Sequence, residues 1–512
     1  MLSHQAYCLD SLKVDSLINL LQKSEPAEKP GLLYEIAYEY MEKNIDLSED
    51  YAMKAIKHAR KNNDYGVVGK TYRILANIYE SQHKMQEAIA AYLKSYKAFK
   101  QNRDYSGAAL AINFIGVLYY ESGELKKAGE YHQKALKIAD LYNLPALQSR
   151  FLHNTGNTFF RSGDYKKAAF YYNKALETNK TIYEQLKQSD TADQLSMNNI
   201  LIKMTNNYTN LGNLFTYWGD FEYALDYFIK ARDTYFKLGD MRRYCGTTMN
   251  IGIVHKRKGD YQTAIDYYTM CLDTARKENF TKVIYLSLYN IGNIYTIWDN
   301  PQTALKYFKD ALDVLRKGED KYLLASIYDI IGSTYLNMDS LEKGFMYYDM
   351  SLEISQKTGA YNQQISVFNN MGEYYKNQKD YTKALEKYNE SLRLAENIDD
   401  IEPKITLHLG LGKLYNRLNN KSKAIYHFTN ALKYAREINN ISFERICLFE
   451  IYNYYYSVGD YKNTVEHLLQ YMKLKDSLFS KESRDKIALF DVKYETEKKE
   501  KELEIRQLKI NN

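Results

Sequence analysis

The chain repeats itself every 40 residues, and this period decides what it can fold into. A glycine recurs with a Leu, Ile or other apolar residue near it and an aromatic residue or histidine three positions later. Its positions are Gly116, Gly156, Gly212, Gly252, Gly292, Gly332, Gly372 and Gly412. One spacing, from 156 to 212, is 56 residues, so about sixteen extra residues lie near 181–197. Self-similarity at a fixed period indicates a stack of repeats that forms one continuous body.

A second motif follows each glycine by twelve residues. It is usually an alanine, at Ala88, Ala128, Ala168, Ala224, Ala264, Ala304, Gly344, Ala384 and Ala424. Ala76 and Tyr452 extend the glycine series by one period at either end, and a weaker first repeat over 31–64 carries Ala55 and Ala59. We therefore predict eleven repeats over residues 31–475. The extra residues near 181–197 form either a partner-specific element or two lengthened helices.

Each repeat is predicted to be a pair of helices. An apolar residue, the glycine and the aromatic residue at i, i+1 and i+4 lie on one helical face. Glycine in a helix costs about 1 kcal/mol relative to alanine, so its recurrence predicts close approach of the neighbouring helix. The turn is Gly-Asp-Tyr or Gly-Asp-Phe at 163–165, 219–221, 259–261 and 459–461. Glycine suits the left-handed residue after the first helix, and aspartate caps the second. Pro301 and Pro403 are expected at helix starts.

These motifs resemble the tetratricopeptide repeat (TPR). The resemblance rests on Leu-Gly-x-x-Tyr, the Gly-Asp-Tyr turn and Ala-x-x-x-Tyr-x-x-Ala-Leu, as in Ala168 to Leu176. A period of 40 rather than about 34 residues is similar to the subclass of GoLoco-binding polarity adaptors and bacterial peptide-responsive regulators. The resemblance implies an all-α fold, a right-handed superhelical solenoid of about eleven helical hairpins. The first helices would line a concave groove that holds a protein or peptide ligand.

Asparagines recur on the predicted first helices and are the candidate binding residues. An Asn side chain has a donor and an acceptor, so a ladder of them can pair with a peptide backbone. Similar asparagines do this in peptide-binding repeats, as the resemblance implies. The alternative is a structural role, in packing beside the glycine or in bonds between repeats. The candidates are Asn154, Asn157, Asn210, Asn213, Asn250, Asn290, Asn293 and Asn370. The 52 tyrosines are expected mainly in the core.

The two ends of the chain differ from the array. Residues 476–512 contain no proline or glycine and are rich in Glu, Lys and Arg, which predicts one charged C-terminal helix, a coiled-coil connector able to self-associate. This tail and an opening such as Asp10 to Leu21 resemble bacterial TPR sensor proteins, where a histidine kinase or DNA-binding domain follows the array. Residues 1–30 are expected to hold a first helix and either a signal-peptide remnant, with Ala6-Tyr7-Cys8 at its end, or an ordinary N-terminus. The array is periplasmic in the first case and cytoplasmic in the second.

Charge and motifs argue against several functions. The net charge is +6 with both signs interspersed, so no nucleic acid is expected as a partner. No apolar run is long enough for a membrane span in this chain, and a membrane anchor in a longer protein stays an open alternative. The four cysteines form no CxxC pair and the nine histidines do not cluster, so neither metal nor cofactor is expected. No GxSxG, Walker, HExxH or GxGxxG set occurs, and we expect no catalysis.

The predicted function is therefore that of a non-catalytic scaffold that binds proteins or peptides. The resemblance at both ends favours the sensory input portion of a bacterial signal-transduction protein. Two alternatives stay open. One is a free-standing adaptor that assembles protein complexes, and the other is a peptide-responsive cytoplasmic regulator.

Overall fold

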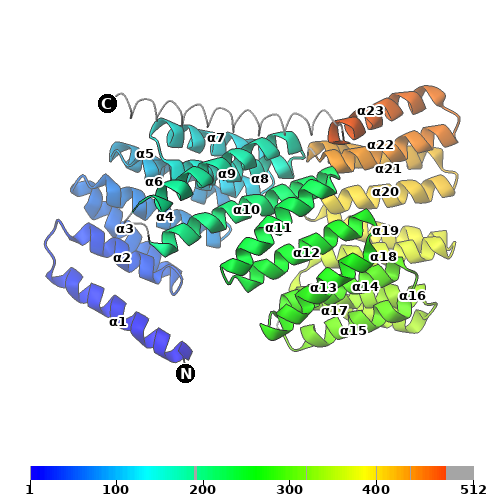
Figure 1. The fold of residues 1–512 in the computed structure, drawn as a ribbon, viewed down its shortest axis with the longest axis horizontal. Helices are drawn as coiled ribbons and strands as arrows, with labels where there is room; N and C mark the ends of the chain where they lie inside the picture. The colour runs from blue at the N-terminus through cyan, green and yellow to red at the C-terminus, as the bar shows by residue number, and fades with distance from the viewer. Residues whose placement is uncertain (1, 190–192, 319, 399, 439, 480–512) are drawn as a thin grey trace. The chain divides into compact units, whose positions relative to one another are not determined.

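The computed structural model describes residues 2–189, 193–318, 320–398, 400–438 and 440–479. Within these ranges the regular secondary structure is entirely α-helical (Figure 1). The helices are α1 (Leu2–Lys23), α2 (Lys29–Tyr40), α3 (Ile45–Lys61), α4 (Tyr65–Ser81), α5 (Met85–Gln101), α6 (Tyr105–Glu121), α7 (Leu125–Leu141), α8 (Pro145–Arg161), α9 (Tyr165–Lys187), α10 (Gln194–Trp218), α11 (Phe221–Lys237), α12 (Met241–Lys258), α13 (Tyr261–Lys277), α14 (Thr281–Ile297), α15 (Pro301–Arg316), α16 (Lys321–Asn337), α17 (Leu341–Thr358), α18 (Tyr361–Asn377), α19 (Tyr381–Glu396), α20 (Glu402–Arg417), α21 (Lys421–Glu437), α22 (Ile441–Ser457) and α23 (Tyr461–Phe479).

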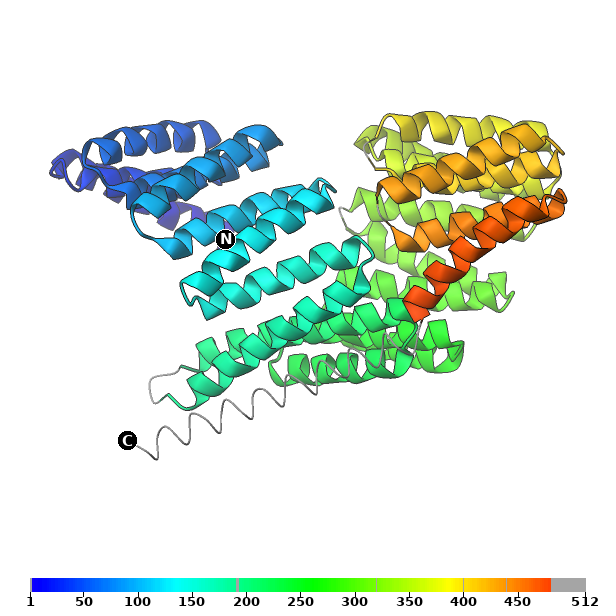
Figure 2. The same ribbon diagram turned by 90° about the horizontal axis from the view of Figure 1, so that it is seen from above.

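From α2 to α23 these helices pair into hairpins, with an even-numbered first helix and an odd-numbered second helix in each repeat. The all-α fold and its division into helical hairpins are thus confirmed. The chain separates into two compact units, residues 1–161 with 170–193, and residues 162–169 with 194 onward. Figure 2 shows hairpins stacked side by side within each unit.

The two ends of the array and its one long spacing, between Gly156 and Gly212, each correspond to particular helices. Helix α1 lies within the predicted N-terminal segment. Around the 56-residue spacing, α9 has 23 residues and α10 has 25, whereas most helices have 17, so the extra residues lengthen these two helices. The array ends with α23 at Phe479. The predicted charged helix over 476–512 lies outside the described residues from 480 onward.

The glycine turns are confirmed. Each turn glycine has a positive φ, between +78° and +87°, at Gly163, Gly219, Gly259 and Gly459. This left-handed conformation ends the first helix at no steric cost to glycine. Asp164 and Asp460 then accept a hydrogen bond from the backbone N–H groups of Lys167 and Asn463, as expected of N-cap residues.

The predicted aspartate cap is wrong at two of the four turns. Asp220 and Asp260 make no side-chain hydrogen bond to the start of the following helix. The Asp260 carboxylate instead lies 3.4 Å from the His255 ring and near the amine of Lys258, at the end of the preceding helix. Pro301 and Pro403 do lie in the first turns of α15 and α20, where a missing N–H costs little.

The glycine of each first helix lies directly against the second helix of its own repeat. A Cβ atom added there would lie only 2.5–3.0 Å from the side chain sixteen residues later. The pairs are Gly116 with His132, Gly156 with Tyr172, Gly212 with Phe228, Gly252 with Tyr268, Gly292 with Phe308, Gly332 with Tyr348, Gly372 with Tyr388 and Gly412 with Phe428. The predicted close approach of two helices is therefore confirmed. A ring of the second helix packs against the backbone of the first helix at the glycine, which has no side chain.

The second motif also lies in the core. The alanines twelve residues after the glycines, from Ala88 to Ala424, are fully buried. Among the tyrosines, the five that face the glycines or their equivalent are buried completely: Tyr92, Tyr172, Tyr268, Tyr348 and Tyr388. Others, such as Tyr426 and Tyr456, are exposed, so core packing explains only part of the tyrosine content.

First helices also approach one another. In the first compact unit α2 contacts α4, α4 contacts α6 and α6 contacts α8. In the second, α10, α12 and α14 contact in order, as do α16, α18, α20 and α22. Second helices make no comparable contact with each other in the part of the chain that the structure describes. The helices that crowd together mark the inner side of a stack, so the first helices line the inner face within each compact unit.

Replacing Gly292 with alanine should destabilise the protein, because the new methyl group would lie 2.5 Å from the Phe308 ring. Overpacking of this kind costs about 1–3 kcal/mol. The control is Gly246→Ala in α12, where a Cβ meets no atom within 4 Å and alanine should stabilise the helix by up to about 1 kcal/mol. Thermal unfolding followed by circular dichroism should give a lower midpoint for Gly292→Ala and an equal or higher one for Gly246→Ala. Equal midpoints would contradict the packing explanation.

Candidate functional site

In several repeats the second-helix aromatic side chain also meets the residue that follows the glycine, or that follows Ala76 in its place. Where that side chain is a tyrosine, its hydroxyl usually bonds to this residue, fifteen positions earlier. The Tyr92 hydroxyl donates to Asn77 at 2.7 Å and the Tyr172 hydroxyl donates to Asn157 at 2.8 Å. Tyr348 and Ser333 are 2.9 Å apart, and Tyr388 donates to Glu373. In these repeats the polar residue after the glycine is therefore used inside the repeat.

The pattern differs where the second helix carries phenylalanine. Asn213 follows Gly212, which faces Phe228, and Asn293 follows Gly292, which faces Phe308. Phenylalanine has no hydroxyl to offer. Both asparagines are half-buried, and neither amide has a hydrogen-bond partner among the residues that the structure describes. A single oxygen atom on the second helix thus separates Asn77 and Asn157, which are engaged, from Asn213 and Asn293, which are not.

Two other candidates bridge neighbouring repeats. Asn154 on α8 donates to the side-chain oxygen of Asn113 on α6, at 3.0 Å. Asn370 on α18 donates to Asp329 on α16, at 2.9 Å. Each donor lies 41 residues after its acceptor, so the two bonds occupy equivalent positions in different repeats. These amides join successive first helices.

The acceptors of these bridges are deeply buried. Asp329 is only 4% exposed and also accepts hydrogen bonds from Ser366 at 2.8 Å and from Gln363 at 3.1 Å. Burial raises the pKa of the Asp329 carboxyl, and the three hydrogen bonds oppose that rise. Asn113 lies 3.1 Å from the ring of His132, whose pKa burial lowers to about 4. The bridges are therefore parts of a packed interior.

The remaining candidates fall into two groups. Asn290 is buried and donates to the backbone oxygen of Leu286 in its own helix, at 2.9 Å. Asn210 is half-buried and has an interaction partner within the chain. Asn250 is half-buried, and among the described residues its amide has no hydrogen bond. Whether any of the eight asparagines binds a ligand stays a prediction.

Asn213, Asn250 and Asn293 lie on three consecutive first helices, α10, α12 and α14, and are called the amide row below. All three belong to the second compact unit. A half-buried amide without a protein partner must bind water or a ligand, because an unpaired polar group costs free energy. Each amide offers two N–H donors and a carbonyl acceptor, which is the complement of a peptide unit. The amide row is therefore the candidate binding surface.

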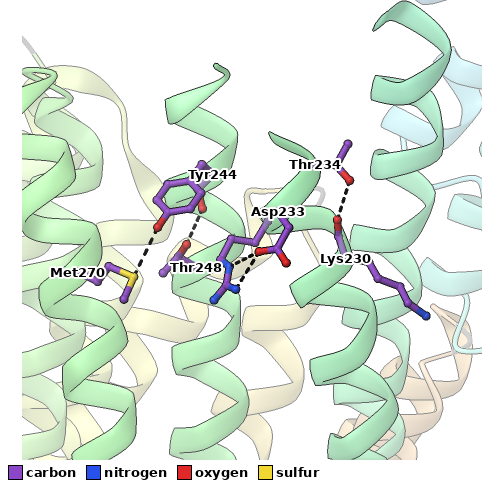
Figure 3. A network of polar contacts seen from close by, with 7 residues as sticks. Lys230, Asp233, Thr234, Tyr244, Thr248 and Met270 are labelled. Carbon is purple, nitrogen blue, oxygen red and sulfur yellow. Dashed lines mark hydrogen bonds and ion pairs between the residues drawn. The ribbon is translucent and has the colours of Figure 1, made fainter. Parts of the chain in front are cut away.

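The polar contacts on the neighbouring helices are mostly local. Figure 3 shows Thr234 bonded to the backbone of Lys230 and Thr248 bonded to the backbone of Tyr244, each one turn earlier on its own helix. The Tyr244 hydroxyl lies 3.5 Å from the Met270 sulfur on α13, which ties two helices together. Asp233 pairs with the adjacent arginine. These contacts stabilise helices and bring no set of reactive groups together.

One pair of histidines was missed by the sequence analysis. The Nδ1 atoms of His408 on α20 and His427 on α21 lie 2.9 Å apart, although the residues are 19 positions apart in sequence. Burial lowers the pKa of each to about 4, with smaller contributions from His427 and Lys423 respectively. No set of three or more His, Cys, Asp or Glu side chains able to hold a metal occurs in the described ranges. None of the helices described there has the length and apolar composition needed to cross a bilayer.

The sequence model of the tetratricopeptide repeat family matches four stretches of the chain, at residues 107–181, 244–317, 323–397 and 363–437. Together they cover just over half of the 512 residues. No curated protein matches the chain in sequence.

Several solved structures are similar. Aspartyl phosphate phosphatase F from Bacillus subtilis is 16% identical, with a TM-score of 0.45 over 76% of this chain and 94% of that one. The apo form of the quorum sensor NprR from B. thuringiensis is 14% identical, with a TM-score of 0.43 over 67% and 98%. The Rap conjugation gene regulator of the plasmid pLS20, in complex with the Phr* peptide, is 16% identical, with a TM-score of 0.40 over 73% and 96%. At these identities and scores the similarity transfers no ligand or activity to this chain.

The hydroxyl of Tyr268 gives a direct check on the glycine–aromatic geometry. It is buried and has no hydrogen-bond partner in the described part of the chain, because the residue after Gly252 is Ile253. Replacing Tyr268 with phenylalanine should raise the free energy of unfolding by about 1 kcal/mol, since an unpaired buried hydroxyl costs about 1–3 kcal/mol. Replacing Tyr172 with phenylalanine should lower it by about 1 kcal/mol, because its hydrogen bond to Asn157 is lost. Urea and thermal midpoints of the two variants should therefore move in opposite directions, and equal losses would contradict the assigned bonds.

Proposed function

Because the chain belongs to the tetratricopeptide repeat family, we propose that it is a non-catalytic scaffold that binds an extended polypeptide along the first helices of its second compact unit. The family alone fixes no partner, since such repeats serve many functions. The observation that carries the proposal is the amide row, three half-buried asparagines without hydrogen bonds to the described part of the chain.

The row fits the repeat of an extended peptide. Helices in direct contact pack about 8–10 Å apart, and an extended chain advances about 3.3 Å per residue. Each successive first helix would therefore meet the peptide at about every third residue. An Asn side chain that donates to a peptide carbonyl and accepts from its N–H binds backbone rather than side chain. Such a surface would accept a range of sequences and leave specificity to neighbouring pockets.

The proposal includes the absence of a catalytic step. Five histidines have known polar contacts, and these contacts are with another histidine, an asparagine, an aspartate or a backbone oxygen: His132, His255, His408, His427 and His467. Cys245, Cys271 and Cys447 are buried, and burial raises the pKa of each of these thiols. A buried thiol held in its neutral form is a packing residue, because the thiolate is the reactive species. Binding is the chemistry that the surface supports.

Among the three roles predicted from the sequence, we favour the peptide-responsive regulator. The regulator role needs only the hairpins and the amide row described above. We take the hairpins to wind into a right-handed superhelix. The role as a sensory input module depends on the charged connector, most of which lies beyond residue 479. A free-standing adaptor would use the same surface, and the identity of the captured polypeptide distinguishes it from a regulator.

The amide row can be tested by replacing Asn213, Asn250 and Asn293 together with alanine. At roughly 1 kcal/mol for each lost hydrogen bond, affinity for extended peptides should fall about 100-fold. The measurement is retention of a random library of amidated octapeptides by the immobilised full chain, read by mass spectrometry. The variant should keep the wild-type helicity, because these amides hold no partner in the described part of the chain.

The matched control replaces Asn389 and Asn430 with alanine. These two asparagines lie on the second helices α19 and α21. This double variant should retain peptides as the wild type does. Wild-type protein that retains no peptide, or an amide-row variant that retains as many, would refute the proposed surface.

A further inference from the structure

Two histidines from different helices lie in direct contact in the second compact unit. The Nδ1 atoms of His408 on α20 and His427 on α21 are 2.9 Å apart. His408 is buried, whereas His427 is half-buried and can be reached from solvent. Burial lowers the pKa of each ring to about 4, so both rings are neutral near pH 7. A neutral imidazole nitrogen is the commonest metal ligand in proteins.

Neighbouring aromatic side chains hold both imidazole rings in place. Tyr415 stacks on His427, with ring centroids 5.3 Å apart and an angle of 9° between the ring planes. The Tyr434 ring lies 5.6 Å from the His408 ring, measured between centroids. Ligands whose rotamers are fixed by packing need little reorganisation to bind an ion. The one opposing feature is the positive charge of Lys423, whose amine lies 5.0 Å from the centre of the Tyr415 ring.

The distance between the two Nδ1 atoms indicates the coordination geometry that they can support. An imidazole nitrogen bonds Zn²⁺ at about 2.0–2.1 Å, and we take the same bond length for Cu(II) and Ni(II). Two such nitrogens would lie about 2.9 Å apart at right angles, about 3.3 Å apart at a tetrahedral angle and about 4 Å apart on opposite sides of the ion. The observed 2.9 Å matches the right angle. Square-planar and tetragonal sites are typical of Cu(II) and Ni(II), and Cu(II) binds more tightly of the two.

We propose that His408 and His427 form a Cu(II) site, with their Nδ1 atoms in adjacent coordination positions of the ion. The described residues add no third His, Cys, Asp or Glu ligand, so water fills the other positions. Without the ion, the Nδ1–H of one ring donates to the Nδ1 of the other ring. When the ion binds, that proton moves to Nε2 of the same ring, and both Nδ1 lone pairs face the metal. Both rings stay neutral, and the ion joins the two helices of one hairpin.

The next repeat supplies a matched control for this site. His467 on α23 lies 40 residues after His427 and also packs on a tyrosine, with its ring centroid 5.3 Å from that of Tyr455. The residue 40 positions after His408 is Leu448, which is fully buried. His467 therefore has the same place in its repeat and the same kind of aromatic neighbour, but a leucine stands where the other pair has its second histidine.

The experiment titrates copper(II) sulfate into the full chain, followed by calorimetry and by electron paramagnetic resonance of the bound ion. His427→Phe should weaken binding at this site by more than about 10-fold, since even loss of a partner outside the ligand set costs about 10–100-fold in metal affinity. This variant keeps a ring on Tyr415, as Tyr307 lies on Tyr295 at the equivalent place of another repeat. A second variant is His408→Leu, because leucine occupies the equivalent place in the next repeat.

His467→Phe should bind Cu(II) as the wild type does. Exposed histidines elsewhere, such as His58 and His83, can also bind the ion, so the site is measured as the difference between variants. The spectrum of that difference should show a tetragonal Cu(II) coupled to two imidazole nitrogens. Wild-type binding by both His427→Phe and His408→Leu, or an equal loss in His467→Phe, would overturn the proposal. The amide row is independent of it, and His427→Phe should retain peptides as the wild type does.

Discussion

The contact between a glycine on a first helix and a ring on the following second helix, found in eight of the eleven hairpins, is the interaction on which the rest of the array depends. A helical glycine costs about 1 kcal/mol relative to alanine, but burial of a Phe or Tyr side chain contributes about 1.5–3 kcal/mol. Burial of the ring outweighs the cost of the glycine only because the ring lies where a Cβ would otherwise be, as Phe308 does at Gly292. Repeated through eight hairpins, the same contact fixes how each pair of helices is aligned.

That alignment decides which first-helix asparagines have a hydrogen-bond partner on the second helix. It places the residue after the glycine at the tip of the ring, so a tyrosine hydroxyl bonds to it and a phenylalanine does not. Asn157 faces Tyr172 and is engaged, whereas Asn213 and Asn293 face Phe228 and Phe308 and have no described partner. The choice between Tyr and Phe in the core thereby sets the chemistry of the surface. The deeper polar pairs, such as Asn370 with Asp329, hold successive first helices together instead.

Much of this fold follows from the sequence, because a glycine that recurs every 40 residues has few physical explanations. Periodicity located the hairpins, the buried alanines and the glycine turns. It did not show that Asn154, Asn157 and Asn370 were engaged, because their partners lie 15 or 41 residues away in sequence. A signal was nonetheless present, since Asn157 occurs with a tyrosine fifteen residues later and Asn213 with a phenylalanine. The His408–His427 pair joins different helices, and nothing in local spacing marks it.

Giving Phe228 and Phe308 a hydroxyl tests most directly the claim that the second-helix ring controls whether Asn213 and Asn293 are free to bind a peptide. In the double variant Phe228→Tyr, Phe308→Tyr, Asn213 and Asn293 are both kept, but each acquires the partner that Tyr172 gives Asn157. Peptide-library retention by the full chain should fall about 30-fold, at roughly 1 kcal/mol for each of the two engaged amides, while the thermal midpoint is unchanged or higher. Unchanged retention in a variant with the wild-type thermal midpoint would contradict the claim.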